Sequence, residues 1–139
     1  MILLDTNVLS ALMQATPDLA VVRWVDAQPG DSVWTTTITI FEVQLGLALL
    51  PPGRRRQRLE ATFDLAVTTL LGGRVLAFDR QAAVAAGAMA AEGRLHGRTV
   101  DVRDVQIAGI TAVRRATLAT RNIRHFDHLG IALIDPWSG

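Results

Sequence analysis

The sequence predicts an α/β fold: a three-layer α/β/α sandwich with a central, mostly parallel sheet of four to five strands. Two observations lead to this prediction. Short apolar or β-branched runs alternate along the chain with longer segments of helical spacing, as in proteins built from successive βαβ units. The first run, residues 2–4, is apolar without interruption, which is typical of a strand whose two faces are both covered.

Composition limits the class of protein. Half of the 139 residues are hydrophobic, so we expect one well-packed domain that spans residues 1–139. The absence of cysteine excludes disulfides and thiolate metal ligands. The apolar stretches are too short to cross a bilayer, and the first residues lack the basic start of a secretory signal. We therefore expect a cytoplasmic protein with no membrane contact.

The first half of the chain contains clear helix and strand signals. Apolar spacing predicts a helix that includes residues 8–13. Thr16, Pro17 and Asp18 have the pattern of an N-cap, a first helical residue and a first-turn acid, which predicts a helix through residues 19–25. The other elements predicted here are a strand at 32–37 and a helix at 38–50.

The second half continues the alternation. A helix is predicted from residue 54 to residue 70, where two glycines end it. Asp79 is the expected cap of a small-residue helix, 81–92, which we expect to pack closely on a neighbour. Residues 93–103 are predicted to form a polar loop. The remaining predicted elements are strands at 75–77, 117–120 and 131–134, a helix at 104–114, and one helical turn within 121–129.

Two carboxylates stand at informative places. Asp5 directly follows the first strand, and ligands in parallel α/β sheets gather at the carboxyl ends of strands. Capping of the next helix alone would also explain Asp5. Glu42 shares its predicted helix face with Ile38 and Leu45, where a carboxylate is costly unless it is paired or bound to a metal. The alternative is that Glu42 lies at the edge of this apolar stripe and reaches solvent.

Asp104 is the third informative acid. It lies in the first turn of its predicted helix, where the helix dipole alone would explain it. If Asp101 is the N-cap, Asp104 is free to face something else. Three converging carboxylates would raise one another's pKa values unless a divalent cation neutralised them. Oxygen ligands favour Mg²⁺ or Mn²⁺ for that role.

Four sequence motifs together carry a family resemblance. They are ILLDTN at the start, IFEVQLG around Glu42, RDVQIAG around Asp104 and LATRNIRHFDHLGI near the end. In this order and spacing they resemble the PIN-domain family, and more closely its toxin ribonucleases of the VapC and FitB type. The resemblance covers essentially the whole chain. It implies a metal-dependent endoribonuclease in which Asp5, Glu42 and Asp104 are the catalytic acids and the ligands of magnesium (Mg²⁺), with Mn²⁺ able to substitute.

The resemblance is weaker at the fourth acidic position. Asn122 stands where many relatives carry a further Asp, and it offers a carbonyl oxygen instead. Asp127 is a nearby alternative carboxylate, so the choice between one metal ion and two stays open. Thr6 resembles the family's hydroxyl beside the first Asp, with an implied role in positioning water. Asn7 and Thr120 are expected to support the site.

The basic residues are the candidates for contact with RNA. All fourteen are arginine, whose planar fork suits phosphate, although a GC-rich genome would explain the bias equally well. The predicted RNA-binding residues are Arg98, Arg103 and Arg121, with Arg124 next. The alternative for each is an ordinary solvated arginine. We interpret His125 as a loop or packing residue.

The resemblance also implies partners and a reaction. The partners are an RNA substrate, a cognate VapB-like antitoxin, a second copy of the chain in a homodimer, and operator DNA bound only through the antitoxin. The reaction is attack of metal-activated water on an RNA phosphodiester, which leaves a 5′-phosphate and a 3′-hydroxyl. The alternative function is a catalytically inactive PIN-like module that binds RNA or protein. A phosphatase with an aspartyl nucleophile is disfavoured, because Asn7 stands where that chemistry needs a second Asp.

Overall fold

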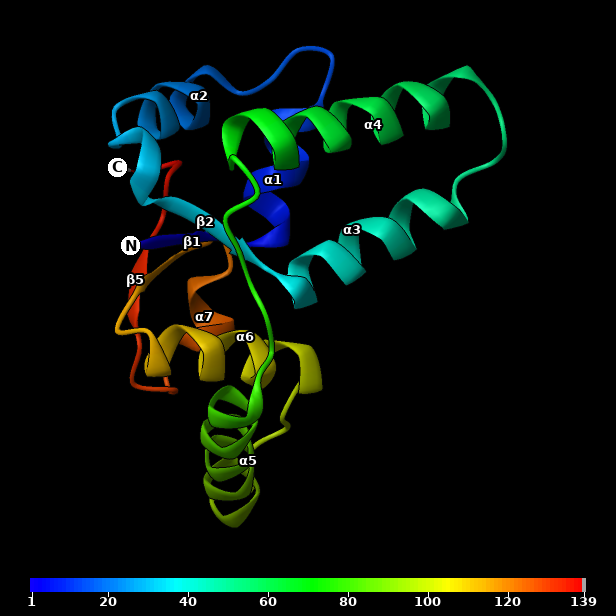
Figure 1. The fold of residues 1–139 in the computed structure, drawn as a ribbon. Helices are drawn as coiled ribbons and strands as arrows, with labels where there is room; N and C mark the ends of the chain where they lie inside the picture. The colour runs from blue at the N-terminus through cyan, green and yellow to red at the C-terminus, as the bar shows by residue number, and fades with distance from the viewer. Residues whose placement is uncertain (139) are drawn as a thin grey trace.

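A computed structural model of the chain describes residues 1–138, which fold around one parallel sheet (Figure 1). The strand order is β3-β2-β1-β4-β5, and all four strand pairings are parallel. The predicted fold class is confirmed, with five strands in the sheet. The strands are β1 (Ile2–Leu4), β2 (Val33–Thr36), β3 (Val75–Leu76), β4 (Thr117–Ala119) and β5 (Ala132–Ile134).

The central strand is covered on both faces, as its sequence predicts. Leu3 and Leu4 point to opposite sides of the sheet because successive side chains of a strand alternate. Each is fully buried, Leu3 in one hydrophobic cluster and Leu4 in the other. The two residues opposite them on β4, Leu118 and Ala119, divide between the same two clusters. The sheet therefore separates two hydrophobic cores.

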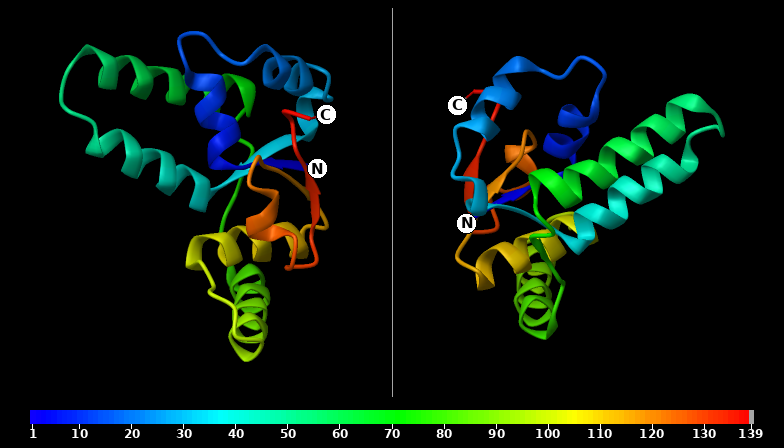
Figure 2. Two further views of the ribbon diagram at one scale, coloured as in Figure 1. Left: turned by 180° about the vertical axis from the view of Figure 1, so that it is seen from behind. Right: turned by 45° about the horizontal axis from the view of Figure 1, so that its top comes forward.

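The helices form a layer on each side of the sheet, which gives the three-layer sandwich seen in Figures 1 and 2. In Figure 2 the hairpin of α3 and α4 extends away from the sheet. One layer contains α1 (Thr6–Met13), α2 (Leu19–Asp26), α3 (Thr37–Leu49) and α4 (Arg54–Leu65), which a π-helical turn, η2 (Ala66–Leu70), extends. The other contains α5 (Arg80–Leu95), α6 (Val102–Val113) and the single turn α7 (Ile123–Phe126). A short 3₁₀ turn, η1 (Gly30–Ser32), precedes β2.

The start of α2 differs from the prediction. Thr16 was the expected N-cap, but Asp18 holds that position, and its Oδ1 accepts a hydrogen bond of 2.9 Å from the Ala20 N–H. A carboxylate makes a stronger, charge-assisted bond to this N–H than a hydroxyl does. Pro17 therefore precedes the helix instead of starting it.

The loop predicted at residues 93–103 is shorter than expected, because α5 continues to Leu95 and α6 starts at Val102. Gly93 looks like a helix terminator in the sequence, but it is a packing residue: a Cβ there would lie 2.8 Å from Cγ2 of Val100. Close packing of the small-residue helix is confirmed. A Cβ on Gly109 of α6 would lie 2.5 Å from the carbonyl oxygen of Ala82 on α5, so only glycine permits this approach.

No helix within residues 1–138 combines the length and the apolar character needed to span a bilayer.

Candidate active site

The fold brings the three predicted acids to one edge of the sheet. Asp5 follows β1, and its N–H donates to the Ala119 carbonyl at 3.0 Å. Helix α3 starts directly after β2, which places Glu42 in its second turn, and α6 carries Asp104 in its first turn. The charge of Asp5 raises the pKa of both Glu42 and Asp104. The three carboxyl groups therefore lie close enough to repel one another.

The Asp5 side chain is buried and receives three hydrogen bonds. The Thr6 N–H donates to Oδ1 at 2.8 Å. The Thr120 hydroxyl donates to Oδ2 at 2.8 Å, and the Asn7 amide donates to the same oxygen at 3.3 Å. Burial raises the pKa of Asp5, and these three bonds oppose the rise because they favour the ionised carboxylate. Asp5 caps α1, as one reading of the sequence expects, and also belongs to the acidic cluster.

The partners of Asp5 are themselves fixed by other groups. The Arg121 N–H donates to Oδ1 of Asn7 at 3.0 Å, so the Asn7 amide nitrogen must face Asp5 and Thr120. The Thr120 oxygen accepts from the Asn122 N–H at 3.0 Å, which leaves its own proton for Asp5. Asn7 and Thr120 thus lie where supports of the site were expected. This small network holds the ends of β1 and β4 together.

Glu42 is half-buried beside a cation. Its Oε2 lies 3.8 Å from Nη1 of Arg103, and its side chain is 22% exposed. Burial and the charge of Asp5 raise the pKa of Glu42, while Arg103 lowers it. The Thr6 hydroxyl lies near enough to lower the pKa of Glu42 as well, but its oxygen is buried and makes no hydrogen bond of ordinary geometry to any of residues 1–138. That hydroxyl is available to a water molecule or a metal ligand.

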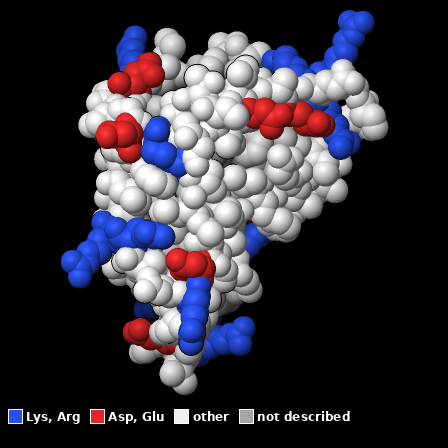
Figure 3. Space-filling view, in the orientation of Figure 1, with Lys and Arg blue, Asp and Glu red and all other residues white. Residues whose placement is uncertain are grey.

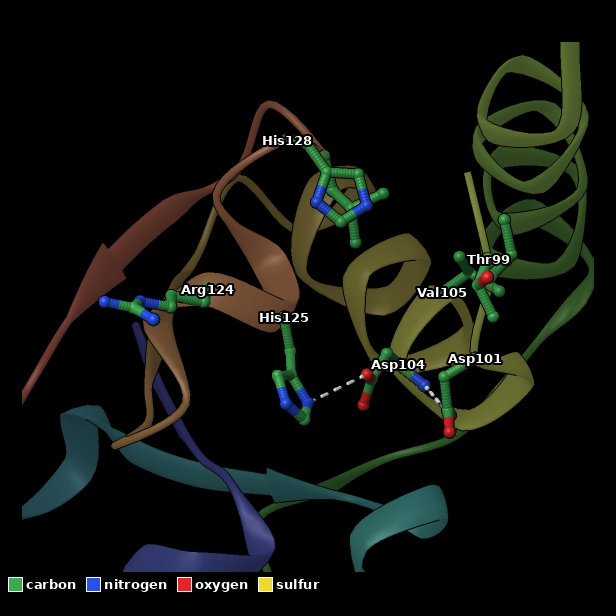
Figure 4. A pocket seen from close by; sticks show the side chains of 9 residues that line it. Thr99, Asp101, Asp104, Val105, Arg124, His125 and His128 are labelled. Carbon is green, nitrogen blue, oxygen red and sulfur yellow. Dashed lines mark hydrogen bonds and ion pairs between the residues drawn. The ribbon is translucent and has the colours of Figure 1, made fainter. Parts of the chain in front are cut away.

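Asp104 has a pKa well above its ordinary value. Asp101 is the N-cap of α6, with its Oδ1 accepting from the Asp104 N–H at 3.1 Å, which leaves the Asp104 side chain free for the site. Burial, then the charges of Asp101 and Asp5, raise the pKa of Asp104 to about 6, against the opposing effect of His125. The Nδ1 atom of His125 lies 3.4 Å from Oδ2 of Asp104 (Figure 4).

His125 is the site residue that the sequence interpretation missed. It was expected to be a loop or packing residue, whereas its side chain is largely exposed and faces Asp104. The signal that was available is its place in the motif: α7 follows β4 and starts after Asn122, at the same sheet edge as Asp5. A single helical turn there was predicted correctly.

Within residues 1–138, four other predicted site residues form no hydrogen bond or ion pair with the three acids. Asn122 is exposed at the start of α7, where its backbone N–H bonds to Thr120. Asp127 is exposed and pairs at 3.5 Å with His128. Arg121 lies over the ring of Trp137, 4.8 Å from its centre. Arg98 is exposed in the segment between α5 and α6. Figure 3 shows acidic and basic groups scattered over one face of the molecule, without one large patch of either sign.

The donor set fits a hard divalent cation. The three acids provide only oxygen ligands, the charge of Asp5 raises the pKa values of the other two, and the buried Thr6 hydroxyl beside them makes no hydrogen bond of ordinary geometry within the described residues. Within residues 1–138 no three His, Asp or Glu side chains converge closely enough to enclose an ion by themselves. Mg²⁺ does not need such a cage, because it keeps several waters and takes only one or two protein carboxylates.

The fold and this site together define a class: parallel α/β proteins with an acidic, oxygen-donor site at the carboxyl edge of the sheet. The chain belongs to one family of that class, the PIN domain family, whose model matches residues 2–131. The four motifs of the sequence are therefore motifs of a PIN domain.

Known relatives cover nearly the whole chain. VapC ribonuclease Y4jK of Sinorhizobium fredii is 36% identical over 137 residues, which are 99% of this chain and 98% of the relative. Toxin FitB of Neisseria gonorrhoeae is 33% identical over 137 residues, 99% of each protein. The crystal structure of FitAcB from Neisseria gonorrhoeae matches with a TM-score of 0.88 and 33% identity, over 99% of both chains.

Proposed function

We propose that the chain is the toxin of a type II toxin–antitoxin system and acts as a Mg²⁺- or Mn²⁺-dependent endoribonuclease. The observation that carries the proposal is the cluster of Asp5, Glu42 and Asp104, whose pKa values are all raised. Its chemistry suits a divalent cation and a phosphodiester substrate. Two relatives support the activity, since one is named a VapC ribonuclease and the other a toxin.

The carboxylates of Asp5, Glu42 and Asp104 would hold the ion, in part through its bound waters, since within residues 1–138 the three do not converge closely enough to enclose it directly. When bound, such an ion supplies an activated water and stabilises negative charge on the scissile phosphate. Thr120 and Asn7 favour the ionised form of Asp5 and orient its carboxylate through their hydrogen bonds. The unpartnered Thr6 hydroxyl would orient a water molecule beside Glu42.

The attacking group is water, so the products are a 5′-phosphate and a 3′-hydroxyl, and the 2′-hydroxyl of the RNA is not needed. The arginines would bind the RNA backbone. Arg103 lies beside Glu42, and the backbone N–H of Arg121 bonds to Asn7 in the network around Asp5, which supports a role for both arginines. The Asn122 carbonyl oxygen stands in for the missing fourth acid. Arg98 lies in the segment between α5 and α6, ahead of Arg103 in the chain.

The proposed partners are a VapB-like antitoxin, a second copy of the chain, and operator DNA reached only through the antitoxin. An apolar stripe on α3 supports the homodimer. Phe41, Leu45 and Leu49 recur every four residues along this helix, and they are 56%, 40% and 77% exposed. Exposed apolar stripes of this kind mark contact with another protein. Light scattering at several concentrations, with Phe41→Arg as the disrupting variant, tests the dimer.

The activity is tested with purified, antitoxin-free protein and a mixed RNA pool. The reactions contain Mg²⁺ or Mn²⁺, or EDTA, and the fragment ends are determined. Asp5→Asn is compared with Asp79→Asn, because both residues cap a helix through a carboxylate and only Asp5 belongs to the cluster. We expect metal-dependent cleavage to 5′-phosphate ends, lost in Asp5→Asn and kept in Asp79→Asn.

The other outcomes are equally informative. Cleavage that survives EDTA and Asp5→Asn would come from a contaminating nuclease and would leave the proposal unsupported. Absence of both cleavage and Mn²⁺ binding would favour the inactive binding module. Mn²⁺ binding that is lost in Asp5→Asn, without cleavage of the pool, would establish the site and direct the search to a specific RNA.

A further inference from the structure

A hollow of about 410 Å³ lies beside the acidic cluster, with Asp104 in its lining. Its volume falls in the range of small-molecule sites, which is about 300 to 1,000 Å³. One wall is the start of α6 with the segment before it, and the other is α7 with the turn that follows (Figure 4). The ion-binding carboxylates do not account for this hollow, since Asp104 is the only one of the three that lines it.

The lining combines an apolar surface with flat rings. Val100, Val105 and Leu129 contribute apolar side chains, and none of the three is exposed. His125 and His128 stand three residues apart, and Figure 4 shows both rings on the α7 side of the hollow. Unpaired RNA bases stack on histidine rings and on apolar surface. The hollow therefore has the surface that a nucleobase requires.

The charges of the hollow do not favour a phosphate group. Asp101 and Asp104 line it against one arginine, Arg124, and two carboxylates repel a phosphodiester wherever no cation neutralises them. A neighbouring hollow of about 330 Å³ has the opposite character, because Arg121 and Arg124 line it with Asp135 as the only acid. Figure 4 shows the Arg124 guanidinium pointing away from Asp104. The second hollow suits a backbone phosphate.

The two hollows are adjacent, because Arg124 and His125 line both of them. His125 also contacts Asp104, so the junction between the hollows lies at the acidic cluster. A single strand that crosses this junction would place a phosphate beside the two arginines and the next base in the hollow near Asp104. The order of the two hollows suits the alternation of phosphate and base along one RNA strand.

We infer that the hollow beside Asp104 is a subsite for one unpaired nucleobase next to the scissile phosphate, with His128 as its stacking residue. The inference rests on the proposed ribonuclease function and adds a determinant of its substrate: the cleaved RNA is single-stranded at this nucleotide, and its base is turned out of any stack. The phosphate chemistry stays with the acids and the arginines.

The test is a double-mutant cycle between protein and RNA. A single-stranded oligoribonucleotide that wild-type protein cleaves is synthesised with an abasic nucleotide at each position around the cut in turn. Binding is measured by fluorescence anisotropy in EDTA, and kcat/KM is measured with Mg²⁺. At one flanking position, loss of the base should weaken binding to wild-type protein by about 5- to 100-fold, as expected for one stacked base.

His128→Ala should weaken binding to the intact oligonucleotide by a similar factor. The affinity of this variant should be the same for the intact oligonucleotide and for the one that lacks the base at that position. His128→Phe keeps a flat ring and should restore the sensitivity. His96→Ala is the matched control, since His96 is an exposed histidine at the end of α5, where Nδ1 bonds to the Glu92 carbonyl. This control should behave like wild type. Thermal unfolding and Mn²⁺ binding, unchanged in His128→Ala, exclude a folding or metal defect.

Two negative results have different meanings. If wild-type protein neither cleaves RNA nor binds Mn²⁺, the proposed function fails and the inference fails with it. If RNA is cleaved, but no abasic position weakens binding or the losses from His128→Ala and the abasic change simply add, the nucleobase subsite is wrong while the nuclease stands.

Discussion

The two ends of the acidic cluster are built differently. Asp5 is buried, and a backbone N–H, a hydroxyl and an amide all donate to it. Asp104 is only half-buried, its one close side-chain partner is His125 at 3.4 Å, and its pKa is raised to about 6. Both carboxylates stand at the same sheet edge, so the difference lies in what surrounds each one.

The comparison shows that the fold holds the Asp5 carboxylate in place without a metal ion, whereas the Asp104 carboxylate stays free to adjust. Asp5 is held by groups that follow the ends of two neighbouring strands, β1 and β4, whose pairing is part of the core. Asp104 is held by one helix and faces the hollow that we assign to a nucleobase. Substrate binding should therefore move the Asp104 side chain and leave the Asp5 side chain in place.

The largest expected effect is at Asp104, where one substitution should lower cleavage and raise the stability of the metal-free protein. Asp104→Asn should reduce cleavage by more than about 100-fold, since loss of a group that merely supports a metal ligand already costs about 10- to 100-fold. The same change should stabilise the metal-free protein at pH 7, because it removes a repelled, partly buried charge. Cleavage assays and thermal unfolding in EDTA measure the two effects. A metal-free variant that is less stable than wild type at pH 7 would contradict this account.

Asp79→Asn provides the reference for that experiment. Asp79 also caps a helix with its carboxylate and is paired at 3.8 Å with Arg114, outside the acidic cluster. It should retain wild-type cleavage.

A smaller effect is expected at the fixed end of the cluster. Thr120→Val removes the hydroxyl that donates to Asp5 and accepts from the Asn122 N–H, while keeping the shape of the side chain. We expect about 10- to 100-fold weaker Mn²⁺ binding or activity, together with a loss of about 1 to 3 kcal/mol in unfolding free energy. Isothermal titration with Mn²⁺ and denaturant unfolding measure these two quantities.

Thr111→Val is the matched control for Thr120→Val. Thr111 is equally buried, but its hydroxyl donates within α6 to the Ile107 carbonyl at 2.8 Å. This variant should keep Mn²⁺ affinity. Equal losses of affinity in the two variants would mean that a buried hydroxyl anywhere in the fold matters, and that Asp5 is not specifically oriented by Thr120.

Much of this architecture could be predicted from the sequence, because its causes are local. The uninterrupted apolar run at Ile2–Leu4 requires cover on both faces, and Asp5 follows it directly. The sequence offers Asp101 as a candidate cap of α6 that would leave Asp104 free, and the structure has this arrangement. The small residues of α5 likewise predict its close approach to α6.

The parts that the sequence could not supply depend on contacts between distant residues. Thr120 and Asp5 are 115 residues apart, and their bond exists because β1 pairs with β4 in one particular register. The orientation of Asn7 is set by the Arg121 N–H, which no local pattern indicates. His125 faces Asp104 because α7 turns back over the sheet edge. Thr16 failed as a cap because a better acceptor, Asp18, stood two residues later.

The pH dependence of stability gives a further, smaller effect. The pKa of Asp104 is about 6 in the folded protein and near its ordinary value of 3.8 in the unfolded chain, so the folded state binds more protons between these values. The stability contribution is present below pH 3.8 and is lost as pH rises through 6. Metal-free wild-type protein should therefore lose about 1 to 2 kcal/mol relative to Asp104→Asn between pH 4 and pH 7, after allowance for solvent screening.

Chemical denaturation in EDTA at several pH values measures this difference. A wild-type protein that gains stability relative to Asp104→Asn as pH rises would reverse the sign and show that Asp104 is stabilised in its ionised form, as a fixed ligand would be. Mn²⁺ should raise the unfolding temperature more at pH 7 than at pH 5, because it binds the ionised carboxylates.

The smallest effect concerns Glu42, the acid between these two extremes, which has a cation as its partner. Arg103→Gln removes an exposed ion pair of 3.8 Å, so the free energy of unfolding should change by less than about 1 kcal/mol. If Arg103 also contacts a phosphate, the variant should lower the slope of log affinity against log salt for single-stranded RNA by about 0.7. Arg54→Gln, at the exposed start of α4, should leave that slope unchanged. An unchanged slope in Arg103→Gln would mean that Arg103 contacts Glu42 and no phosphate. Glu42 would then be, like Asp5, a ligand that the protein itself holds in place.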